Sequence, residues 1–448
     1  LYDYDVMPTF RDNDDELFAT WNGWQLLTDG GTRGWTLWPQ RYRRNEVRFE
    51  LPSYFRERPF YVVQPYLEHP PLLHVLVGIA AKLSGAHHWL HAKLKYTRLV
   101  PIALSVLATW LVMLVAQRLS RDGPAPEFAG LLYAVLPPLV LQQRVIKEET
   151  LVTTLLLGAM WLFLRWRDDG RTPRLLVWLG IVCGLGALTK LPAGVLVPVF
   201  VALVWAESDW RAAGRVAISG LLVSALVLVY GAVVSWSVFT HATAIQATLR
   251  HAHWNVFFRF FAEPLVNHNR FGAGWIVFLW IALAGAWATY TERDRRLLAF
   301  TLIGYLVAIA IPSGNWHYGW YFLPLYPILV IGTGRFLANL YAEPDLLRGA
   351  LLLVLPVFYA LNFTAEPTWL VHYWPAMKNL VTTATIAGLA PFAAVSIWPG
   401  VWSRRSARAA MVLLLATLVV TCVYIVATYD AGFDLFLNFD EDSLRRGS

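Results

Sequence analysis

Apolar runs of about twenty residues recur along almost the whole of this 448-residue chain. A helix of that length crosses a hydrocarbon core about 30 Å thick. The composition agrees, because 57% of the residues are hydrophobic and 15% are charged, whereas soluble domains carry roughly 25% charged residues. The period-two alternation that marks a membrane-spanning barrel is absent. The sequence therefore predicts an all-α polytopic membrane protein.

We predict about 12 transmembrane helices from these runs. A thirteenth is expected ahead of Leu1, because the chain begins without Met, although a removed signal is an alternative. The run at 71–85 is short, begins Pro-Pro and contains His74 and Lys82, so we interpret it as an interfacial helix. The predicted spans are 98–119, 127–143, 150–166, 174–189, 191–206, 215–239, 274–290, 297–313, 318–340, 349–364, 380–402 and 409–429.

Arginine residues sit mainly at the ends of the apolar runs, and they set the expected topology. The net charge of +7 thus indicates a positive-inside orientation and argues against a nucleic-acid partner. We place residues 1–97 outside as a first outer loop with interfacial helices, because the acidic cluster near its start then shares a side with the other outer loops. The charge rule does not settle this step, since counting 71–85 as a span would place residues 1–68 in the cytoplasm. Residues 98–429 form the transmembrane domain, and residues 430–448 form a short outer tail. The expected location is a cell membrane, with the active site on the extracytoplasmic side.

Carboxylates gather near the start of the chain, in Asp12-Asn13-Asp14-Asp15-Glu16. An Asp before an apolar run is usually a helix N-cap, and Asn13, Asp14 or Asp15 fits that role for a helix at 16–27. One member of the cluster serving as the cap leaves at least one carboxylate free. A carboxylate pair just outside a membrane indicates chemistry at the membrane surface, so we take Asp15 and Glu16 as catalytic candidates.

Several motifs, in order, resemble the GT-C superfamily of integral-membrane glycosyltransferases, and above all its protein O-mannosyltransferases and lipid A aminoarabinose transferases. Three positions differ from the family pattern: His69 replaces Lys, Glu149 replaces Asp, and Leu191 replaces Gly. The stretches that carry the resemblance are Asp15-Glu16, His69-Pro70-Pro71-Leu72, Arg98-Leu99-Val100-Pro101, Arg144 with Glu149, Gly186-Ala187-Leu188-Thr189-Lys190, and Tyr321-Phe322-Leu323-Pro324-Leu325-Tyr326-Pro327.

The resemblance implies transfer of a sugar from a polyprenyl-phosphate donor. Such a transfer needs a carboxylate that takes the acceptor proton and cations that stabilise the departing phosphate. Lys190 interrupts a long apolar run, where a Lys is costly unless it is paired or snorkels. It marks an outer turn or contacts the lipid phosphate. Glu148 and Glu149 begin a span, where carboxylates also favour the helix N-terminus, and the resemblance makes Glu149 an acceptor or metal contact.

Further candidates lie in the outer loops. Arg259 and Arg270 belong to the long loop 240–273 and are chosen for the phosphate because Arg binds phosphate in a fork; interfacial anchoring is the alternative. His317 opens another outer turn and is a weaker phosphate-binding candidate. Glu68 and His69 are candidate acceptor or metal ligands. A divalent metal ion stays an open alternative, because no ligand spacing is sharp enough to predict one.

Three classes of function remain. The first is an inverting glycosyltransferase that moves a sugar from a polyprenyl-phosphate donor to a hydroxyl of a protein, lipid or glycan, with Asp15 as base. The second is a transporter or lipid flippase, which predicts ionisable residues in mid-span and repeated halves. The spans are nearly free of charge and show no repeat, so the enzyme is favoured. A catalytically inactive structural subunit of a membrane complex is a further alternative.

Overall fold

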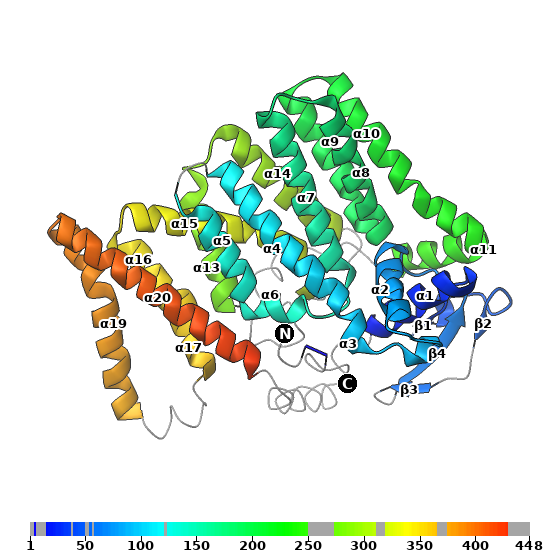
Figure 1. Ribbon diagram of the computed structural model, residues 1–448, viewed down its shortest axis with the longest axis horizontal. Helices are drawn as coiled ribbons and strands as arrows, with labels where there is room; N and C mark the ends of the chain where they lie inside the picture. Colours follow the sequence, from blue (N-terminus) through cyan, green and yellow to red (C-terminus); the bar gives the residue numbers. More distant parts are fainter. Residues whose placement is uncertain are drawn as a thin grey trace. The chain divides into compact units, whose positions relative to one another are not determined.

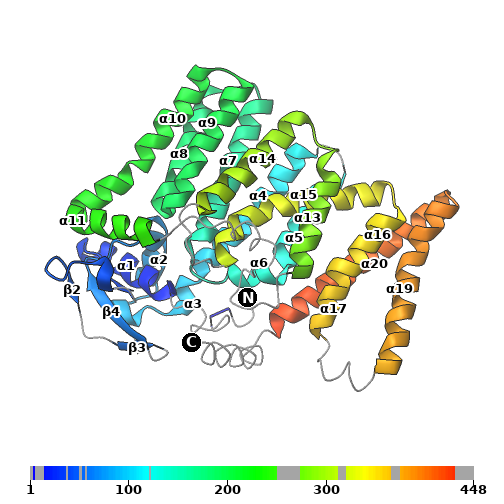
Figure 2. The same cartoon turned by 180° about the vertical axis from the view of Figure 1, so that it is seen from behind.

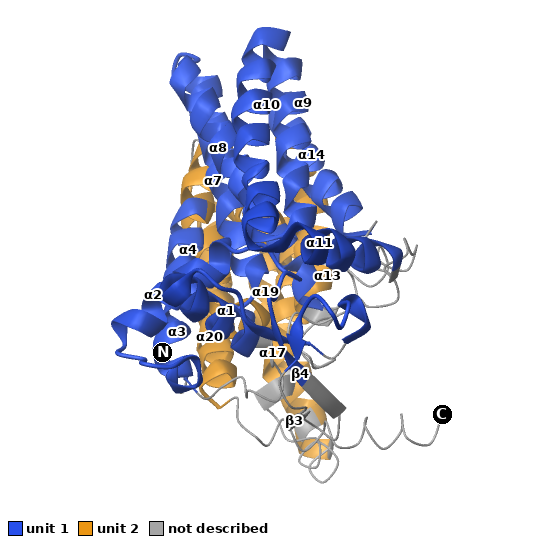
Figure 3. Ribbon diagram, turned by 90° about the vertical axis from the view of Figure 1, so that its right-hand side faces the viewer, with its two compact units in different colours: residues 1–111, 142–260, 292–325 blue, residues 112–141, 261–291, 326–448 orange. Residues whose placement is uncertain are grey.

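The computed structural model describes residues 4–5, 15–36, 39–49, 53–55, 58–120, 123–249, 273–310, 319–364 and 374–428. The chain divides into two compact units, coloured separately in Figure 3. Unit 1 comprises residues 1–111, 142–260 and 292–325, and unit 2 comprises residues 112–141, 261–291 and 326–448.

Unit 1 begins with α1 (Asp15–Asp29), a small sheet and α2 (Leu72–Leu83), and α1 starts at the predicted catalytic residues Asp15 and Glu16 (Figure 1). Helix α1 matches the helix expected at 16–27, and α2 matches the expected helix at 71–85. The interfacial position of α2 stays a prediction. The other short elements here are η2 (Pro39–Arg41), η3 (Trp89–His91) and α3 (Leu94–Thr97).

A small antiparallel sheet lies between α1 and α2 in the sequence, so the all-α prediction is wrong for this segment. The strands are β1 (Gly34–Thr36), β2 (Arg48–Phe49), β3 (Ser53–Phe55) and β4 (Arg58–Gln64), and β4 pairs with each of the others. In the register, Trp35 lies opposite Val62 and Phe49 lies opposite Val63. Aromatic and β-branched residues in β4 suit a pleated surface. A search for twenty-residue apolar runs does not detect strands this short.

The remaining elements of unit 1 are mostly long apolar helices (Figures 1 and 2). Glycines bring α8 and α10 together, since a Cβ on Gly184 would meet the carbonyl oxygen of Gly220. Ser235 has extended backbone angles and kinks α11. The bounds are α7 (Glu148–Asp168), α8 (Pro173–Thr189), η4 (Leu191–Val195), α9 (Leu196–Glu207), α10 (Trp210–Ser224), α11 (Leu226–Leu249), α14 (Glu292–Ala310) and η5 (Gly319–Leu325).

The regular elements in the described residues of unit 2 are all helices, and α4 (Leu99–Leu119) runs from unit 1 into it. The Pro137-Pro138 pair separates α5 from α6, because proline supplies no amide for the helix ladder. The predicted span 127–143 is therefore two helices. The bounds are α5 (Ala125–Val135), α6 (Pro137–Gln142), α13 (Ala273–Trp287), α15 (Tyr326–Ala342), α16 (Leu346–Leu352), η6 (Leu353–Val357), α17 (Phe358–Thr364), α19 (Trp374–Ile397) and α20 (Val401–Ala427).

Five helices within the described residues are long and apolar enough to cross a membrane: Leu94–Leu119, Trp210–Thr248, Gly319–Ala342, Lys378–Ile397 and Val401–Ala427. Shorter apolar helices, such as Pro173–Thr189 and Leu191–Glu207, coincide with other predicted spans. The mostly helical, polytopic character is thus confirmed, while the number of twelve spans stays a prediction.

The crossing of α1 and α2 depends on two glycines. A Cβ on Gly78 would meet the backbone of Gly23, and a Cβ on Gly23 would meet the carbonyl of His74. We expect Gly78→Ala to destabilise the protein by about 1–3 kcal/mol, since overpacking forces the helices apart. Thermal unfolding in detergent measures this. Gly214→Ala is the matched control, because nothing lies within 4 Å of a Cβ there. Equal unfolding temperatures for the two variants would contradict the close approach.

Candidate active site

The start of α7 gathers charged side chains inside unit 1. Glu148 and Glu149 occupy its first turn and are both buried, with Lys147 in the N-cap position. Negative side chains are stabilised at a helix N-terminus by the helix dipole. The helix that contains the predicted span 150–166 therefore starts two residues earlier, at Glu148 and Glu149. A helix dipole alone does not offset the burial of two carboxylates, so partners are required.

Glu148 has two histidine partners. Its Oε1 lies 3.0 Å from His69 Nδ1 and 3.6 Å from His74 Nε2. Asn22 lies behind His74, with its Nδ2 at 2.8 Å from His74 Nδ1, and its Oδ1 accepts from the amide of Arg33 at 3.2 Å. Because that amide fixes the orientation of the Asn22 side chain, Nδ2 donates to His74 Nδ1. The proton of neutral His74 is then on Nε2, which faces Glu148.

The protonation of this pair follows from its surroundings. Burial tends to raise the pKa of Glu148, but the charge of His69, the close contacts of His69 and His74 and the charge of Lys190 outweigh it. The pKa of Glu148 therefore lies well below its usual value. Burial lowers the pKa of His74, against the opposing effect of Glu148. Glu148 is thus ionised and His74 is neutral at neutral pH.

Glu149 is paired with Lys190, which is the C-cap of α8. Burial tends to lower the pKa of Lys190, but the charge and hydrogen bond of Glu149, together with Tyr321 and the charge of Glu148, outweigh it and the pKa is raised. The ammonium also lies 4.1 Å from the ring centre of Tyr321, and Lys147 lies 3.9 Å from the ring centre of Trp320. The predicted turn at Lys190 is confirmed, and the ion pair explains how a Lys is tolerated next to apolar helices.

Glu16 has a complete set of partners. Its carboxylate accepts from Arg98 Nε at 2.9 Å, from Arg98 Nη2 at 2.6 Å and from the amide of Ile146 at 3.0 Å. Both charged side chains are fully buried. This bidentate pair ties α1 to the start of α4 and to the approach to α7, which indicates a positioning role. The catalytic role assigned to Glu16 stays a prediction that these contacts do not favour.

The other predicted residues separate into two groups. Glu68 pairs with Arg41, and its backbone carbonyl accepts from Gln246 at 3.2 Å. Asp15 begins α1, but its side chain lies outside the described part of the structure, as do Arg259, Arg270 and His317. Among the described residues, no group of three His, Cys, Asp or Glu side chains is arranged to hold a metal ion.

Sequence reasoning did not assign four members of this cluster: Asn22, His74, Arg98 and Glu148. Some signal was present, since His74 interrupts an apolar helix and Arg98 belongs to a motif noted for its resemblance. Glu148 was interpreted only as part of a helix start. The pairings of these residues connect segments far apart in the chain, which local patterns do not specify.

Comparison with known proteins shows that part of the chain is similar to a described protein family. A protein-family profile described as dolichyl-phosphate-mannose-protein mannosyltransferase matches residues 68–236, which is less than half of the chain. His69, His74, Arg98, Glu149 and Lys190 all lie within that match. The matched segment therefore contains most of the buried charge cluster.

Two bacterial proteins illustrate the similarity in sequence. Undecaprenyl phosphate-alpha-4-amino-4-deoxy-L-arabinose arabinosyl transferase 2 of Pseudomonas fluorescens is 25% identical over 302 residues, which cover 63% of this chain and 52% of that protein. The corresponding transferase of Pseudomonas paraeruginosa is 28% identical over 275 residues, covering 57% of this chain and 47% of that protein. The chain thus spans about half the length of these relatives.

Solved structures show the same fold. ArnT from Cupriavidus metallidurans superimposes with a TM-score of 0.53 in the apo state and 0.54 when bound to undecaprenyl phosphate. The sequence identities are 17% and 16%, and the matches cover 92% of this chain and 72% and 73% of those chains. The predicted resemblance to the GT-C integral-membrane glycosyltransferases is confirmed. The chain is an integral membrane protein with an ArnT-like fold.

The lowered pKa of Glu148 makes stability depend on pH. A carboxylate with a lowered folded pKa contributes stability above its ordinary pKa of about 4.3, and this contribution is lost as pH falls toward the folded value. We expect Glu148→Gln to flatten the fall in unfolding temperature below about pH 4.3. Neutral His74 adds a separate loss below about pH 6.5, which the variant retains. Glu127→Gln, at an exposed helix position, is the control. An unchanged acid slope in Glu148→Gln would refute the assignment.

Proposed function

We propose that this protein is an inverting glycosyltransferase of the GT-C type. It moves a sugar from a polyprenyl-phosphate donor to a hydroxyl of a protein, lipid or glycan. The site lies at the extracytoplasmic membrane face, in a chain organised as an outer segment (1–97), a domain of about twelve spans (98–429) and a tail (430–448). The sequence relatives are named as transferases of a sugar linked to undecaprenyl phosphate, which supports this donor class.

The reaction assigned here is a single displacement. The acceptor oxygen forms a bond to the anomeric carbon while the bond from that carbon to the phosphate oxygen breaks. The polyprenyl phosphate leaves with the electron pair, and the carboxylate of Asp15 takes the acceptor proton. Attack opposite to the leaving phosphate inverts the anomeric configuration. Cations must therefore surround the phosphate, where negative charge develops.

The observation that carries the proposal is the environment of Lys190. An ammonium has three donors, and Glu149 takes one of them. The Lys190 side chain keeps 13% of its surface accessible, whereas Glu149 keeps none. Lys190 is therefore the accessible end of a pair whose other end is buried, and its raised pKa keeps it charged. Such a cation contacts a phosphate without losing its internal partner.

The other assignments complete the proposed site. Arg259 and Arg270 bind the same phosphate, and His317 adds a further donor. Glu149 holds Lys190 in place rather than contacting the acceptor directly. His69, with 23% of its side chain exposed, is the accessible member of the Glu148 pair and contacts the acceptor. Glu68 positions His69 through its bond to Arg41.

Replacement of Lys190 tests the phosphate site. We expect Lys190→Gln to weaken binding of undecaprenyl phosphate about tenfold or more, because charged hydrogen bonds contribute about 1.5–3 kcal/mol. Lys190→Arg should retain much of the affinity. Native mass spectrometry of the purified protein with added lipid measures the bound fraction. Lys378→Gln, at an exposed position of α19, is the matched control.

Removal of Lys190 alone leaves Glu149 buried without its partner, so misfolding must be separated from lost binding. The double variant Glu149→Gln with Lys190→Gln removes both charges. Its thermal unfolding establishes that it is folded, and its lipid affinity is then compared with that of the wild type. Wild-type affinity in the folded double variant would overturn the role of Lys190.

Replacement of Asp15 tests the reaction itself. General base catalysis contributes about 10²–10⁴-fold, so Asp15→Asn should lose transfer by that factor while undecaprenyl phosphate still binds. The assay uses the membrane fraction with a labelled polyprenyl-phosphate sugar and follows the label into acceptor. Unchanged transfer in Asp15→Asn would remove Asp15 as the base. Movement of labelled lipid across the bilayer without any glycosylated product would favour a flippase.

A further inference from the structure

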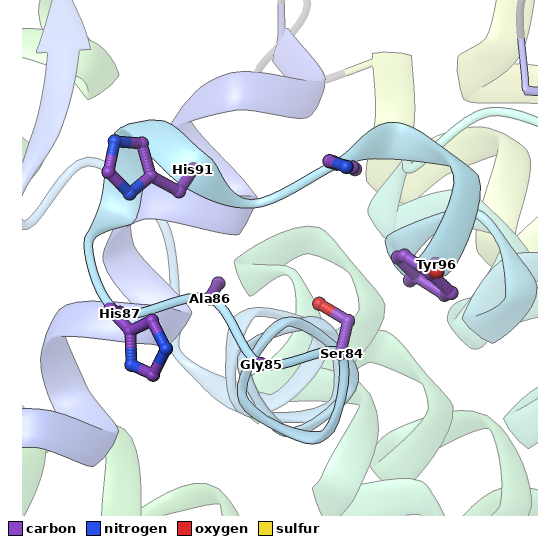
Figure 4. A pocket seen from close by; sticks show the side chains of 7 residues that line it. Ser84, Gly85, Ala86, His87, His91 and Tyr96 are labelled. Atoms are coloured by element: carbon purple, nitrogen blue, oxygen red, sulfur yellow. The ribbon is translucent and has the colours of Figure 1, made fainter.

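The turn between α2 and α3 forms a pocket outside the charge cluster just described (Figure 4). Its volume is about 210 Å³. Drug-sized ligands occupy pockets of roughly 300–1,000 Å³, so this one suits a smaller polar group. The lining residues are Ser84, Gly85, Ala86, His87, His91, Lys93 and Tyr96. None of them belongs to the proposed active site.

The backbone of this turn is held by its own hydrogen bonds. Gly85 has a φ of +80°, the left-handed conformation that commonly ends a helix. The amides of residues 84–86 donate to the last carbonyls of α2. Those carbonyls are therefore satisfied and do not repel an anion in the pocket. Figure 4 shows the labelled side chains arranged along this turn and the loop that continues to Tyr96.

The chain segment that forms the pocket carries several basic side chains and no carboxylate. Residues 69–121 contain no Asp or Glu, whereas His87, His88, His91, Lys93 and Lys95 lie within nine positions of one another. Among the described residues that line the pocket, none carries a carboxylate. Arg98 is neutralised by Glu16, so it does not add to this field. The pocket therefore favours a negatively charged ligand.

Apolar side chains are exposed beside these cations. Leu83 is 83% exposed at the end of α2, Leu90 is 59% exposed in η3, and Leu99 is 43% exposed at the start of α4. The apolar stretch Leu94–Leu119 begins next to the pocket. Cations and exposed leucines at the end of a span are the pattern of a lipid headgroup site, since acyl chains cover the leucines while the headgroup meets the charges.

We propose that this pocket binds the phosphate of an anionic membrane lipid, through Lys93, His87 and His91. The phosphate oxygens accept from the Lys ammonium and from the imidazole N–H groups, and the acyl chains lie along the exposed leucines. A net negative headgroup is favoured over a zwitterionic one, because the amine of a zwitterionic lipid would meet Lys93. This site is separate from the donor site and does not depend on the glycosyltransferase assignment.

The test is stabilisation of the purified full chain by a defined lipid. Unfolding temperature is measured in detergent during titration with phosphatidylglycerol, phosphatidylcholine or inorganic phosphate. We expect phosphatidylglycerol alone to raise the unfolding temperature. In Lys93→Gln with His87→Gln and His91→Gln, the lipid concentration for half-maximal stabilisation should rise about tenfold. The matched control is Lys378→Gln, which should respond as the wild type does.

The replaced side chains are exposed, so the variant is expected to fold, and its unfolding temperature without lipid checks this. Single variants at Lys93, His87 and His91 then apportion the effect. Full stabilisation of the triple variant by phosphatidylglycerol would overturn the site. Equal stabilisation of the wild type by inorganic phosphate would show that the pocket binds a free anion and would overturn the proposal that its ligand is a lipid.

Discussion

The arrangement of the helices in unit 1 depends on ion pairs and contacts among buried charged side chains. Glu16, Glu148 and Glu149 are buried, and each is held by a cation or a histidine from another segment. An unpaired buried carboxylate costs several kcal/mol, whereas a well-packed apolar cluster of the same volume is often at least as stable as a buried ion pair. Stability alone therefore does not account for charges at this place, whereas the proposed phosphate site would account for them.

Those pairs also decide which segments meet. Glu16 to Arg98 joins α1 to α4, Glu148 joins α7 to the loop before α2 and to α2 itself, and Glu149 joins α7 to the end of α8. Each pair stays satisfied only while its two helices keep their register, because a displacement of a few ångströms leaves a buried charge unpaired. The accessible ends of the network, Lys190 and His69, are positioned by partners that water hardly reaches.

Local features of the sequence predicted much of this arrangement. The apolar runs predicted most of the long helices, and the acidic cluster at residues 12–16 followed by a helical pattern predicted α1. The cost of a Lys within an apolar stretch marked Lys190 before its partner was known. Partners and strands were beyond such reasoning. Arg98 lies 82 positions from Glu16, and β4 pairs with three strands through registers that no short window encodes. Glu16 was therefore assigned to catalysis, although its carboxylate is occupied.

The two proposed sites, at Lys190 and at the pocket of Lys93, His87 and His91, differ in burial and in partners, so they favour different ligands. Lys190 already has a buried carboxylate partner, so in the proposed donor site it would contact a phosphate with its remaining donors, in a place largely shielded from salt. Lys93, His87 and His91 are exposed on a segment without carboxylates, where a charged contact is screened within about 8 Å at physiological ionic strength. A ligand of that surface must therefore gain part of its affinity from apolar contact. A lipid supplies this through its acyl chains, whereas a free anion does not.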